Sequence, residues 1–468
     1  MKPVLVLALA RPTFDIPYAE ECAAAAFRAI DAAGLATVGP RGLLFDADAA
    51  RAAIAAIDAQ DIAAVLILQT TFTDAQTTVE IARRFAGVPL ALWAFPEPRS
   101  GGRLRLNAFC GLNLAAHALG RAGLAHAWLH GAPDDDGLAG FLAGLGRPAS
   151  APATRLRPAR PGDAGAQGGA EALEAKLANR RIGLVGEHPA GFDTCRYDAG
   201  VLAGLGGVAV APIGLGETFA RARAVPDSET ETRRRAATTQ YRGLGDVDQA
   251  QLGRSLALHA ALEAIRDERK LDALAVRCWP ETFTEYGCAV CGPMGMMTEA
   301  GTPCACEADV HGALTALMMQ EAAGAPAWLV DIVDMDAHDD TGVLWHCGSA
   351  PLSMADPEHP AEAQIHSNRR MPLLAQFPLK PGRITLARLS QARNGLFLAL
   401  GAGDVRRAPM AFTGTSAVVA LDGGVGAARE RLIDEALEHH VAIVYGDHRG
   451  VLESWAARKG LPVLDLTA

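Results

Sequence analysis

Short apolar runs alternate with longer alanine-rich stretches over the first third of the chain. Residues 4–10, 64–69 and 89–95 have the length and composition of buried strands, and residues 18–33 are typical of a helix. Strands that alternate with helices predict a parallel sheet covered by helices. Residues 148–169 are rich in Pro, Gly, Ala and Arg and show no periodicity, so we expect a linker there.

The alternation resumes after this segment and then changes. A long helix is predicted at 249–268, with strands at 181–187, 208–213 and 273–278. From about residue 371 the runs become short and β-rich, with Gly and Pro between them, which predicts a small β-barrel or sandwich. Its strands are expected at 383–389, 396–399 and 417–421, followed by a helix at 427–438, a strand at 441–445 and a closing helix at 452–459. We therefore expect three domains, at 1–170, 171–345 and 346–468.

Composition narrows the class of protein. Half of the 468 residues are apolar and 21% are charged, which is typical of a soluble globular protein. Because 43 Lys and Arg face 53 Asp and Glu, the net charge of -10 argues against a nucleic acid partner. No apolar run reaches the length of a membrane span, and nine cysteines, an odd number, do not suit a secreted disulfide framework. We expect a cytoplasmic protein without a membrane partner. There is no P-loop or well-placed GxGxxG motif, which disfavours a nicotinamide dehydrogenase.

Reactive side chains concentrate between residues 278 and 347. Glu307 precedes a helix and is expected to lie in line with its apolar face, whose positions are 310, 313, 314, 317, 318 and 321. Glu307, with Asp309 as a second acid, also fits a structural role at the positive end of the helix dipole. An apolar strand at 327–330 ends in Asp331, where α/β folds place ligands, and His346 lies in the next apolar run.

Two carboxylates and an imidazole form a hard, oxygen-rich donor set. Such a set suits Mn²⁺ or Mg²⁺, with Co²⁺ as a third candidate. A cation of this kind polarises a sugar carbonyl and stabilises an enediolate, while a carboxylate moves a proton between C1 and C2. The pattern therefore indicates aldose–ketose isomerisation. A structural zinc site formed by Cys288, Cys291, Cys304 and Cys306 is the rival interpretation of this region.

Seven motifs spread over nearly the whole chain make the sequence similar to a known family. They are 11–15 (RPTFD), 101–107 (GGRLRLN), 277–281 (RCWPE), 306–314 (CEADVHGAL), 345–351 (WHCGSAP), 381–389 (PGRITLARL) and 439–447 (HHVAIVYGD). On these motifs the chain resembles the metal-dependent ketol-isomerases that include L-fucose isomerase and L-arabinose isomerase.

The resemblance implies roles for individual residues. Glu307 and Asp331 match the paired carboxylates that bind the metal and transfer the proton. His440 matches the late metal-ligating histidine, and His346 matches a ligand of the arabinose isomerase branch, here a ligand or a substrate contact. The structural alternatives are a strand-edge role for His440 and a solvated position at a helix end for His439. The candidates for the substrate wall or lid are Arg11, Gln69, Trp93, Arg103, Trp279 and Trp345, for which ion pairing or core packing is the alternative.

The resemblance also implies an architecture and an assembly. Family members have two Rossmann-like α/β domains followed by a C-terminal β-barrel-like domain, and they form homotrimers or homohexamers with shared active sites. Two departures, Ala308 in place of a common Gly and the methionine-rich segment 293–297, suggest an altered pocket wall. We expect a small or modified sugar as the substrate. An epimerase, a carbon–carbon lyase or transferase, and a non-catalytic sugar sensor are the alternatives.

Overall fold

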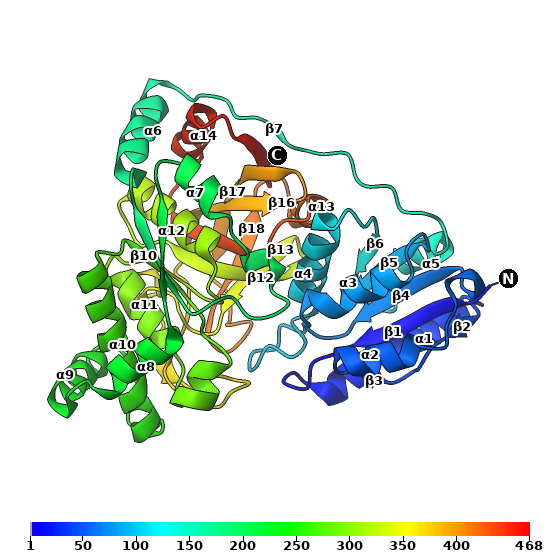
Figure 1. The fold of residues 1–468 in the computed structure, drawn as a ribbon, viewed down its shortest axis with the longest axis horizontal. Helices are drawn as coiled ribbons and strands as arrows, with labels where there is room; N and C mark the ends of the chain where they lie inside the picture. The colour runs from blue at the N-terminus through cyan, green and yellow to red at the C-terminus, as the bar shows by residue number, and fades with distance from the viewer. Residues whose placement is uncertain (1) are drawn as a thin grey trace.

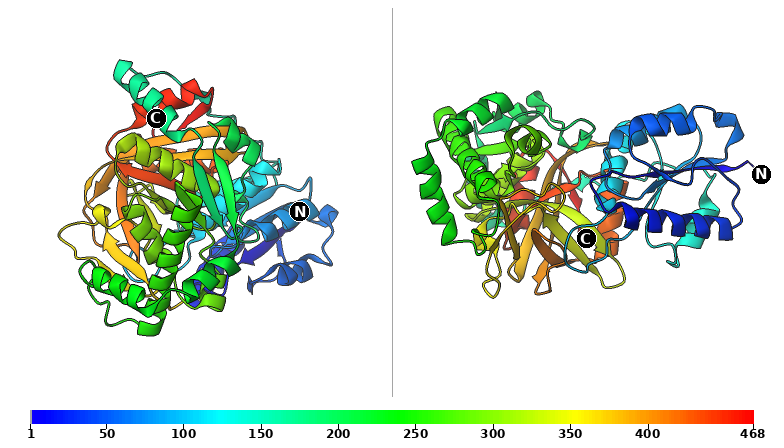
Figure 2. Two further views of the ribbon diagram at one scale, coloured as in Figure 1. Left: turned by 60° about the vertical axis from the view of Figure 1, so that its left-hand side comes forward. Right: turned by 90° about the horizontal axis from the view of Figure 1, so that it is seen from below.

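The computed structural model describes residues 2–468, which form a mixed α/β fold built on three sheets. The first unit, blue in Figure 1, lies to one side of the rest of the chain, and Figure 2 (right) shows it as a lobe beside the green helices. The predicted α/β class is confirmed. Within residues 2–468, no helix combines the length and the apolar character that crossing a bilayer requires.

The first sheet is parallel throughout, as the alternating pattern predicts. Its strands are β2 (Thr37–Val38), β1 (Val4–Leu9), β4 (Ala64–Gln69), β5 (Leu90–Ala94) and β6 (Ala127–His130), in that order, with β3 (Leu43–Leu44) paired to β1. Every residue of β1, β4 and β5 is buried, as expected for strands of a sheet covered on both faces. The helices of this unit are α1 (Ile16–Ala32), α2 (Ala47–Ile54), α3 (Ala75–Arg84), α4 (Ala108–Arg121) and α5 (Leu138–Gly144).

Helix α4 joins the first unit to the rest of the molecule. It contacts β5 of its own sheet on one side and β12 (Trp328–Asp336) and α13 (Val425–Asp434) on the other. All its residues from Ala108 to Leu119 are therefore buried. Polar groups on α4 bond across the junction: His117 Nδ1 lies 2.8 Å from the carbonyl oxygen of Ala436.

The second sheet is also parallel. Its order is β11 (Cys304–Ala305), β10 (Ala273–Val276), β8 (Arg181–Val185) and β9 (Ala209–Ile213). The helices around it are α6 (Ala164–Leu177), α7 (Ala199–Gly204), α8 (Leu215–Arg223), α9 (Asp227–Thr238), α10 (Gln249–Arg269), α11 (Cys291–Glu299) and α12 (Val310–Ala323). Short helical turns occur at η1 (Ala59–Asp61), η2 (Asp193–Cys195), η3 (Thr282–Tyr286) and η4 (Leu352–Met354).

The predicted linker at 148–169 is only partly irregular. Within it, β7 (Arg157–Pro158) pairs with β20 (Pro462–Asp465), and α6 begins at Ala164. The carboxylate of Asp163 caps α6 by accepting the N–H of Ala166. Only three positions of α6 are buried, so its apolar stripe was too sparse to recognise in a Gly- and Ala-rich sequence; they are Ala170, Leu173 and Leu177.

The third sheet contains ten strands and closes on itself. Its order is β14 (Glu362–Gln364), β15 (Leu374–Pro378), β18 (Thr415–Leu421), β13 (Thr341–His346), β12, β19 (His440–Tyr445), β16 (Gly382–Ala392), β17 (Gly395–Arg406), β20 and β7. Because β17 also pairs with β18, the strands from β18 to β17 form a closed antiparallel barrel, which confirms the predicted barrel-like unit. Helix α14 (Arg449–Arg458) lies beside β17. Strand β12 and most of β13 belong to the predicted second domain, which ends at residue 345, yet both strands pair within this sheet. The domain boundaries remain predictions.

Strand β12 does not end where the sequence suggested. The apolar run at 327–330 was expected to end at Asp331, but the strand continues to Asp336. Residues 328–331 pair with β19 and residues 331–336 pair with β13, so the part of the strand beyond Asp331 is held by β13 and the carboxylates do not interrupt it. Asp331 therefore lies within a barrel strand and not at the carboxyl end of a parallel strand.

Candidate active site

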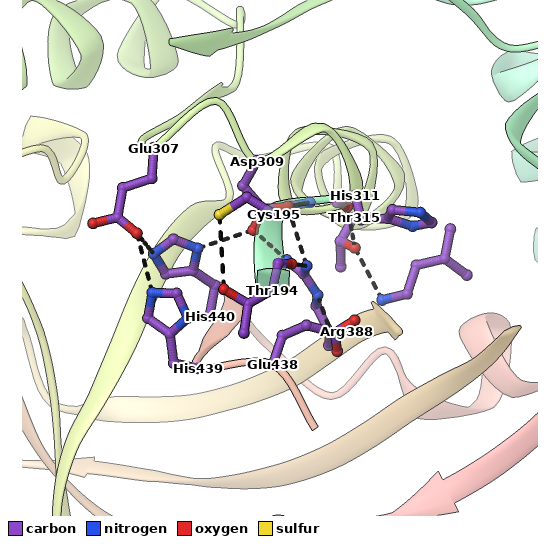
Figure 3. A network of polar contacts seen from close by, with 12 residues as sticks. Thr194, Cys195, Glu307, Asp309, His311, Thr315, Arg388, Glu438, His439 and His440 are labelled. Atoms are coloured by element: carbon purple, nitrogen blue, oxygen red, sulfur yellow. Dashed lines mark hydrogen bonds and ion pairs between the residues drawn. The ribbon is translucent and has the colours of Figure 1, made fainter. Parts of the chain in front are cut away.

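Three segments that are far apart in the sequence meet in one buried site. The loop between β11 and α12 supplies Glu307, β12 supplies Asp331 and β19 supplies His440 (Figure 3 shows Glu307 and His440). In the barrel, Asp331 pairs directly with His440 on one side and with Trp345 on the other. Side chains of directly paired residues lie on the same face of a sheet. The register of the barrel therefore places the carboxylate of Asp331 beside the imidazole of His440.

Glu307 points into the site from the loop that precedes α12, and its backbone does not continue the helix. Helix α12 begins only after Asp309, whose carboxylate accepts the N–H of Gly312 and so caps the helix. Glu307 and Ala308 have φ angles of 56° and 57°, in the left-handed region. This is the region of the backbone map that favours glycine, and Ala308 adopts it here.

Two donors hold the carboxylate of Glu307. Trp279 Nε1 donates to Oε1 at 3.2 Å, and His439 Nε2 lies 3.1 Å from Oε2. Burial raises the pKa of Glu307, but the hydrogen bond and charge of His439 and the charge of His440 outweigh it, so the pKa is lowered. Glu307 is therefore ionised at neutral pH.

His440 is oriented by a buried acid. Its Nδ1 lies 2.9 Å from Asp309 Oδ2, and Arg388 on β16 donates to both oxygens of Asp309, at 2.5 and 3.1 Å (Figure 3). The three side chains are at most 1% exposed. Burial raises the pKa of Asp309, but the charge of Arg388 and the hydrogen bond from His440 lower it well below its usual range. Because the Nδ1–H of His440 donates a hydrogen bond to Asp309, its Nε2 faces the other two carboxylates.

Asp331 has an oxygen that lacks a hydrogen-bond partner. Its Oδ1 lies 3.2 Å from His440 Nε2, yet no donor among residues 2–468 is aligned on it. Burial raises the pKa of Asp331, but the charge of His346 and the contact with His440 outweigh it and lower the pKa to about 2. An ionised, buried oxygen without a donor is typical of a group that faces a cation.

His346 lies at the end of β13, close to the other imidazole. Its Nδ1 accepts the N–H of Cys347 at 2.9 Å, its Nε2 contacts Cys306 Sγ, and its ring centre is 5.8 Å from that of His440. Burial and the neighbouring Cys278 raise the pKa of the Cys306 thiol well above its usual value. Cys306 is therefore a neutral thiol, which is a poor metal ligand.

Three groups in the described part of the chain have donor atoms close enough to share a cation, and all contain His440. They are Glu307 with His439 and His440, Cys306 with His346 and His440, and Cys195 with Asp309 and His440. None of these groups contains Cys288, Cys291 or Cys304, so the structural zinc interpretation gains no support within residues 2–468. All nine cysteines are free.

The pocket above this site contains three of the six predicted substrate-wall residues. Arg11, Trp279 and Trp345 line it together with Glu307 and Asp331. The aromatic side chains Phe14, Phe72 and Phe283 and four cysteines, Cys278, Cys291, Cys306 and Cys347, complete much of its wall. Arg11, Phe14 and Phe72 of the first unit therefore line the same pocket as the carboxylates of Glu307 and Asp331.

The other three predicted wall residues do not line this pocket. Trp93 is fully buried in β5 and donates its Nε1–H to the carbonyl of Gly131 at 2.9 Å. Gln69 is also buried and donates to the carbonyl of Thr71. Arg103 donates to the carbonyl of Thr13 at 3.0 Å. Within one chain, Trp93 and Gln69 contribute to the first unit's interior, and Arg103 supports a loop that borders the pocket.

Comparison with known proteins identifies the family of this chain. A family profile described as "Fucose/sulfoquinovose isomerase, N-terminal domain" matches residues 6–140. The chain is 30% identical over 450 residues to a sulfoquinovose isomerase of Priestia aryabhattai, covering 95% of this chain and 94% of the relative. It is also 30% identical over 410 residues to a sulfoquinovose isomerase of Alkalicoccus urumqiensis, covering 86% of each. The chain belongs to the fucose/sulfoquinovose isomerase family.

Membership in this family makes the protein a sugar isomerase that interconverts an aldose and a ketose. The resemblance to the fucose isomerase branch is thereby confirmed, and the interpretation as a non-catalytic sugar sensor is set aside. A sulfoquinovose isomerase of Clostridium sp. (strain MSTE9) is 29% identical over 388 residues, or 82% of each chain.

Sequence reasoning missed several residues of this isomerase site. Asp309 was considered only as a helix-dipole acid, because its contact with His440 joins residues 131 positions apart. His439 was expected in solvent but is 1% exposed, because every residue from 435 to 440 is buried ahead of β19. Arg388 lies in the motif 381–389, and a cationic residue between Ala387 and Leu389 of a predicted strand was a signal that could have identified it.

Proposed function

We propose that this protein isomerises sulfoquinovose, a glucose that carries a sulfonate in place of its C6 hydroxyl, to the corresponding ketose with the help of a divalent cation. The observation that supports the chemistry best is the convergence of three side chains: His440 Nε2 lies 3.7 Å from Glu307 Oε2 and 3.2 Å from Asp331 Oδ1. The substrate is suggested by relatives that share the name sulfoquinovose isomerase over as much as 95% of the chain.

The donor set fits a hard cation. Glu307 and Asp331 supply ionised oxygens. His440 directs its Nε2 at them because its Nδ1–H donates a hydrogen bond to Asp309. The oxygen of Asp331 without a hydrogen bond is a further sign that a cation belongs there. We assign Mn²⁺ to this site, with Mg²⁺ and Co²⁺ as substitutes, because oxygen-rich sets prefer such ions. When bound, the cation polarises the carbonyl of the sugar and stabilises negative charge on its oxygens.

His346 suits a different role from that of His440. A neutral imidazole has one N–H and one lone pair, and the lone pair on Nδ1 of His346 already accepts the N–H of Cys347. The ring proton is then on Nε2, which contacts Cys306 Sγ. His346 also lines the pocket, where a substrate oxygen would replace this thiol as the acceptor. We therefore propose that His346 donates a hydrogen bond to a substrate oxygen, and that the ligands are Glu307, Asp331 and His440.

The carboxylates move the proton. Isomerisation removes a proton from C2 of the aldose to give an enediolate and returns a proton to C1, and Glu307 and Asp331 both line the pocket in ionised form. The donors Trp279 and His439 keep the carboxylate of Glu307 in one orientation. The aromatic wall of the pocket limits the access of water to the enediolate.

The expected assembly and location stay proposals. A homotrimer or homohexamer with shared active sites follows from the family resemblance, and Trp93, Gln69 and Arg103 would then support the wall. Nine free thiols fit a reducing compartment such as the cytoplasm.

Turnover of sulfoquinovose in deuterated water, followed by NMR, tests the proposed function. We expect conversion to the ketose with deuterium incorporated at the carbon that receives the proton, and loss of both on chelation with EDTA. Glu307→Gln and Asp331→Asn should each lower kcat by about 10³-fold, because an amide cannot accept the proton. Asp336→Asn, at the end of the same strand β12, is the matched control and should keep full activity. Full activity in Glu307→Gln or Asp331→Asn would refute the mechanism, and a product with fewer carbons would indicate a lyase.

A further inference from the structure

The pocket has a cationic end that the metal site does not explain. Arg11, just after β1, and Arg369, in the loop between β14 and β15, line the same pocket as Glu307 and Asp331. A neutral sugar bound at the carboxylates would give these two guanidinium groups no counter-charge. Their presence indicates that the ligand itself carries an anion.

Arg369 lacks a counter-ion in the described part of the chain. No carboxylate of residues 2–468 forms an ion pair with its guanidinium group, which is half-buried. Burial and the charge of nearby Arg11 both lower the pKa of Arg369, so the two cations face each other unfavourably. A half-buried like-charge pair of this kind is stabilised when an anion binds between or beside its members.

Arg11 is only partly neutralised. It forms an ion pair with Asp74 at 3.0 Å, and the two side chains are 21% and 32% exposed. Water therefore weakens this ion pair. One guanidinium face remains close to the aromatic wall, 5.5 Å from the ring centre of Phe72.

Trp279 connects the two ends of the pocket. Its indole ring centre lies 5.4 Å from Arg11 and 5.7 Å from Arg369, while its Nε1–H donates to Glu307. A sugar lying along this ring can place its reacting carbons at the carboxylates and its far end at the arginines. Both guanidinium groups are also ordered by their stacking contacts, which lowers the entropy lost on binding.

We infer that Arg369, together with Arg11, binds the anionic group at C6 of the substrate and selects charged sugars over neutral ones. The inference rests on the proposed function for its ligand and extends it to the residues that read the sulfonate. A sulfonate has three acceptor oxygens and a permanent negative charge, which matches the forked donors of arginine. A phosphate ester at C6 also offers acceptor oxygens and a negative charge, so the test must distinguish a sulfonated sugar from a phosphorylated one.

The test compares Arg369→Gln with Arg370→Gln, its exposed neighbour, which does not line the pocket. For each protein loaded with Mn²⁺, kcat and KM are measured with sulfoquinovose, with glucose 6-phosphate and with the neutral 6-deoxyglucose. We expect Arg369→Gln to raise KM for sulfoquinovose by about 30-fold with little change in kcat, because a charge-assisted contact is lost. The rate with 6-deoxyglucose should stay the same or rise, and Arg370→Gln should match the parent protein.

The outcomes separate this inference from the proposed function. An unchanged KM for sulfoquinovose in Arg369→Gln, or an equal loss with the neutral sugar, would overturn the anion site. A lower KM for glucose 6-phosphate than for sulfoquinovose in the parent protein would keep the anion site and assign it to a phosphate. Calorimetric titration with sulfoquinovose covers the remaining case: binding that depends on Arg369 without turnover would sustain the anion site while refuting the proposed function.

Discussion

At the scale of single residues, the contact between Asp309 and His440 decides which imidazole nitrogen faces the pocket. Asp309 Oδ2 accepts a hydrogen bond from His440 Nδ1, with 2.9 Å between the two atoms, and Arg388 donates to Asp309 in turn. Such carboxylate–histidine pairs fix both the tautomer and the orientation of a metal ligand. Asp309 therefore acts on His440, the proposed metal ligand, and does not contact the substrate.

Weakening this contact should weaken the binding of the metal. In Asp309→Asn the amide is a poorer acceptor for the Nδ1 proton, so we expect the Mn²⁺ concentration for half-maximal activity to rise by about 10–100-fold. Activity measured against Mn²⁺ concentration checks this, and excess Mn²⁺ should restore most of kcat. An unchanged half-saturation point would show that Asp309 does not position His440.

The sequence identified some residues of the site and not others. Glu307 and His440 were identified because each lies in a motif similar to those of known isomerases, and Asp331 because it follows the apolar run at 327–330. Their orienting partners were not, because Arg388 meets Asp309 across 79 positions and only the packing of β16 on α12 brings them together. Arg369 likewise lies in an irregular loop, where hydrophobic periodicity gives no information.

At the scale of elements, strands were easier to predict than their ends. Residues 64–69 were recognised in full because every side chain of β4 is buried and all are apolar except Gln69 at the end of the strand. The extension of β12 beyond Asp331 was missed, since pairing with β13 lets the strand contain carboxylates. Helix α6 was missed because small residues hide its stripe, and the left-handed turn at Glu307 has no hydrophobic signature.

Arg388 ties three elements together and should matter for stability. It lies on β16, donates to Asp309 at the start of α12, and its Nε is 3.7 Å from Glu438 Oε2 just before β19. Arg388→Met leaves two buried carboxylates without their cation, so we expect the free energy of unfolding to fall by about 3–5 kcal/mol.

Urea unfolding of Arg388→Met checks this expectation. Arg383→Met, on the same strand, is the matched control, because its ion pair with Asp422 is 31% and 34% exposed. It should cost about 1 kcal/mol or less. Equal effects of the two substitutions would contradict the role given to Arg388.

At the scale of the whole molecule, the site forms where the three sheets come together. The barrel supplies Asp331 and His440, the loop after β11 of the second sheet supplies Glu307, and Arg11 and Phe72 of the first unit line the pocket. Figure 1 shows the first unit beside the barrel. Helix α4, buried from Ala108 to Leu119, holds the first unit against the barrel. No single unit contains the whole site, so the isomerase chemistry depends on their packing.

Locating the cation tests the central proposal most directly. Crystals grown with Mn²⁺ and measured at a wavelength where manganese scatters anomalously should show one strong peak per chain, at bonding distance from Glu307, Asp331 and His440 Nε2. The peak should be absent in Asp331→Asn at the same Mn²⁺ concentration. An anomalous peak on Cys306 and His346 instead, or none in an active protein, would contradict the assignment of these three ligands.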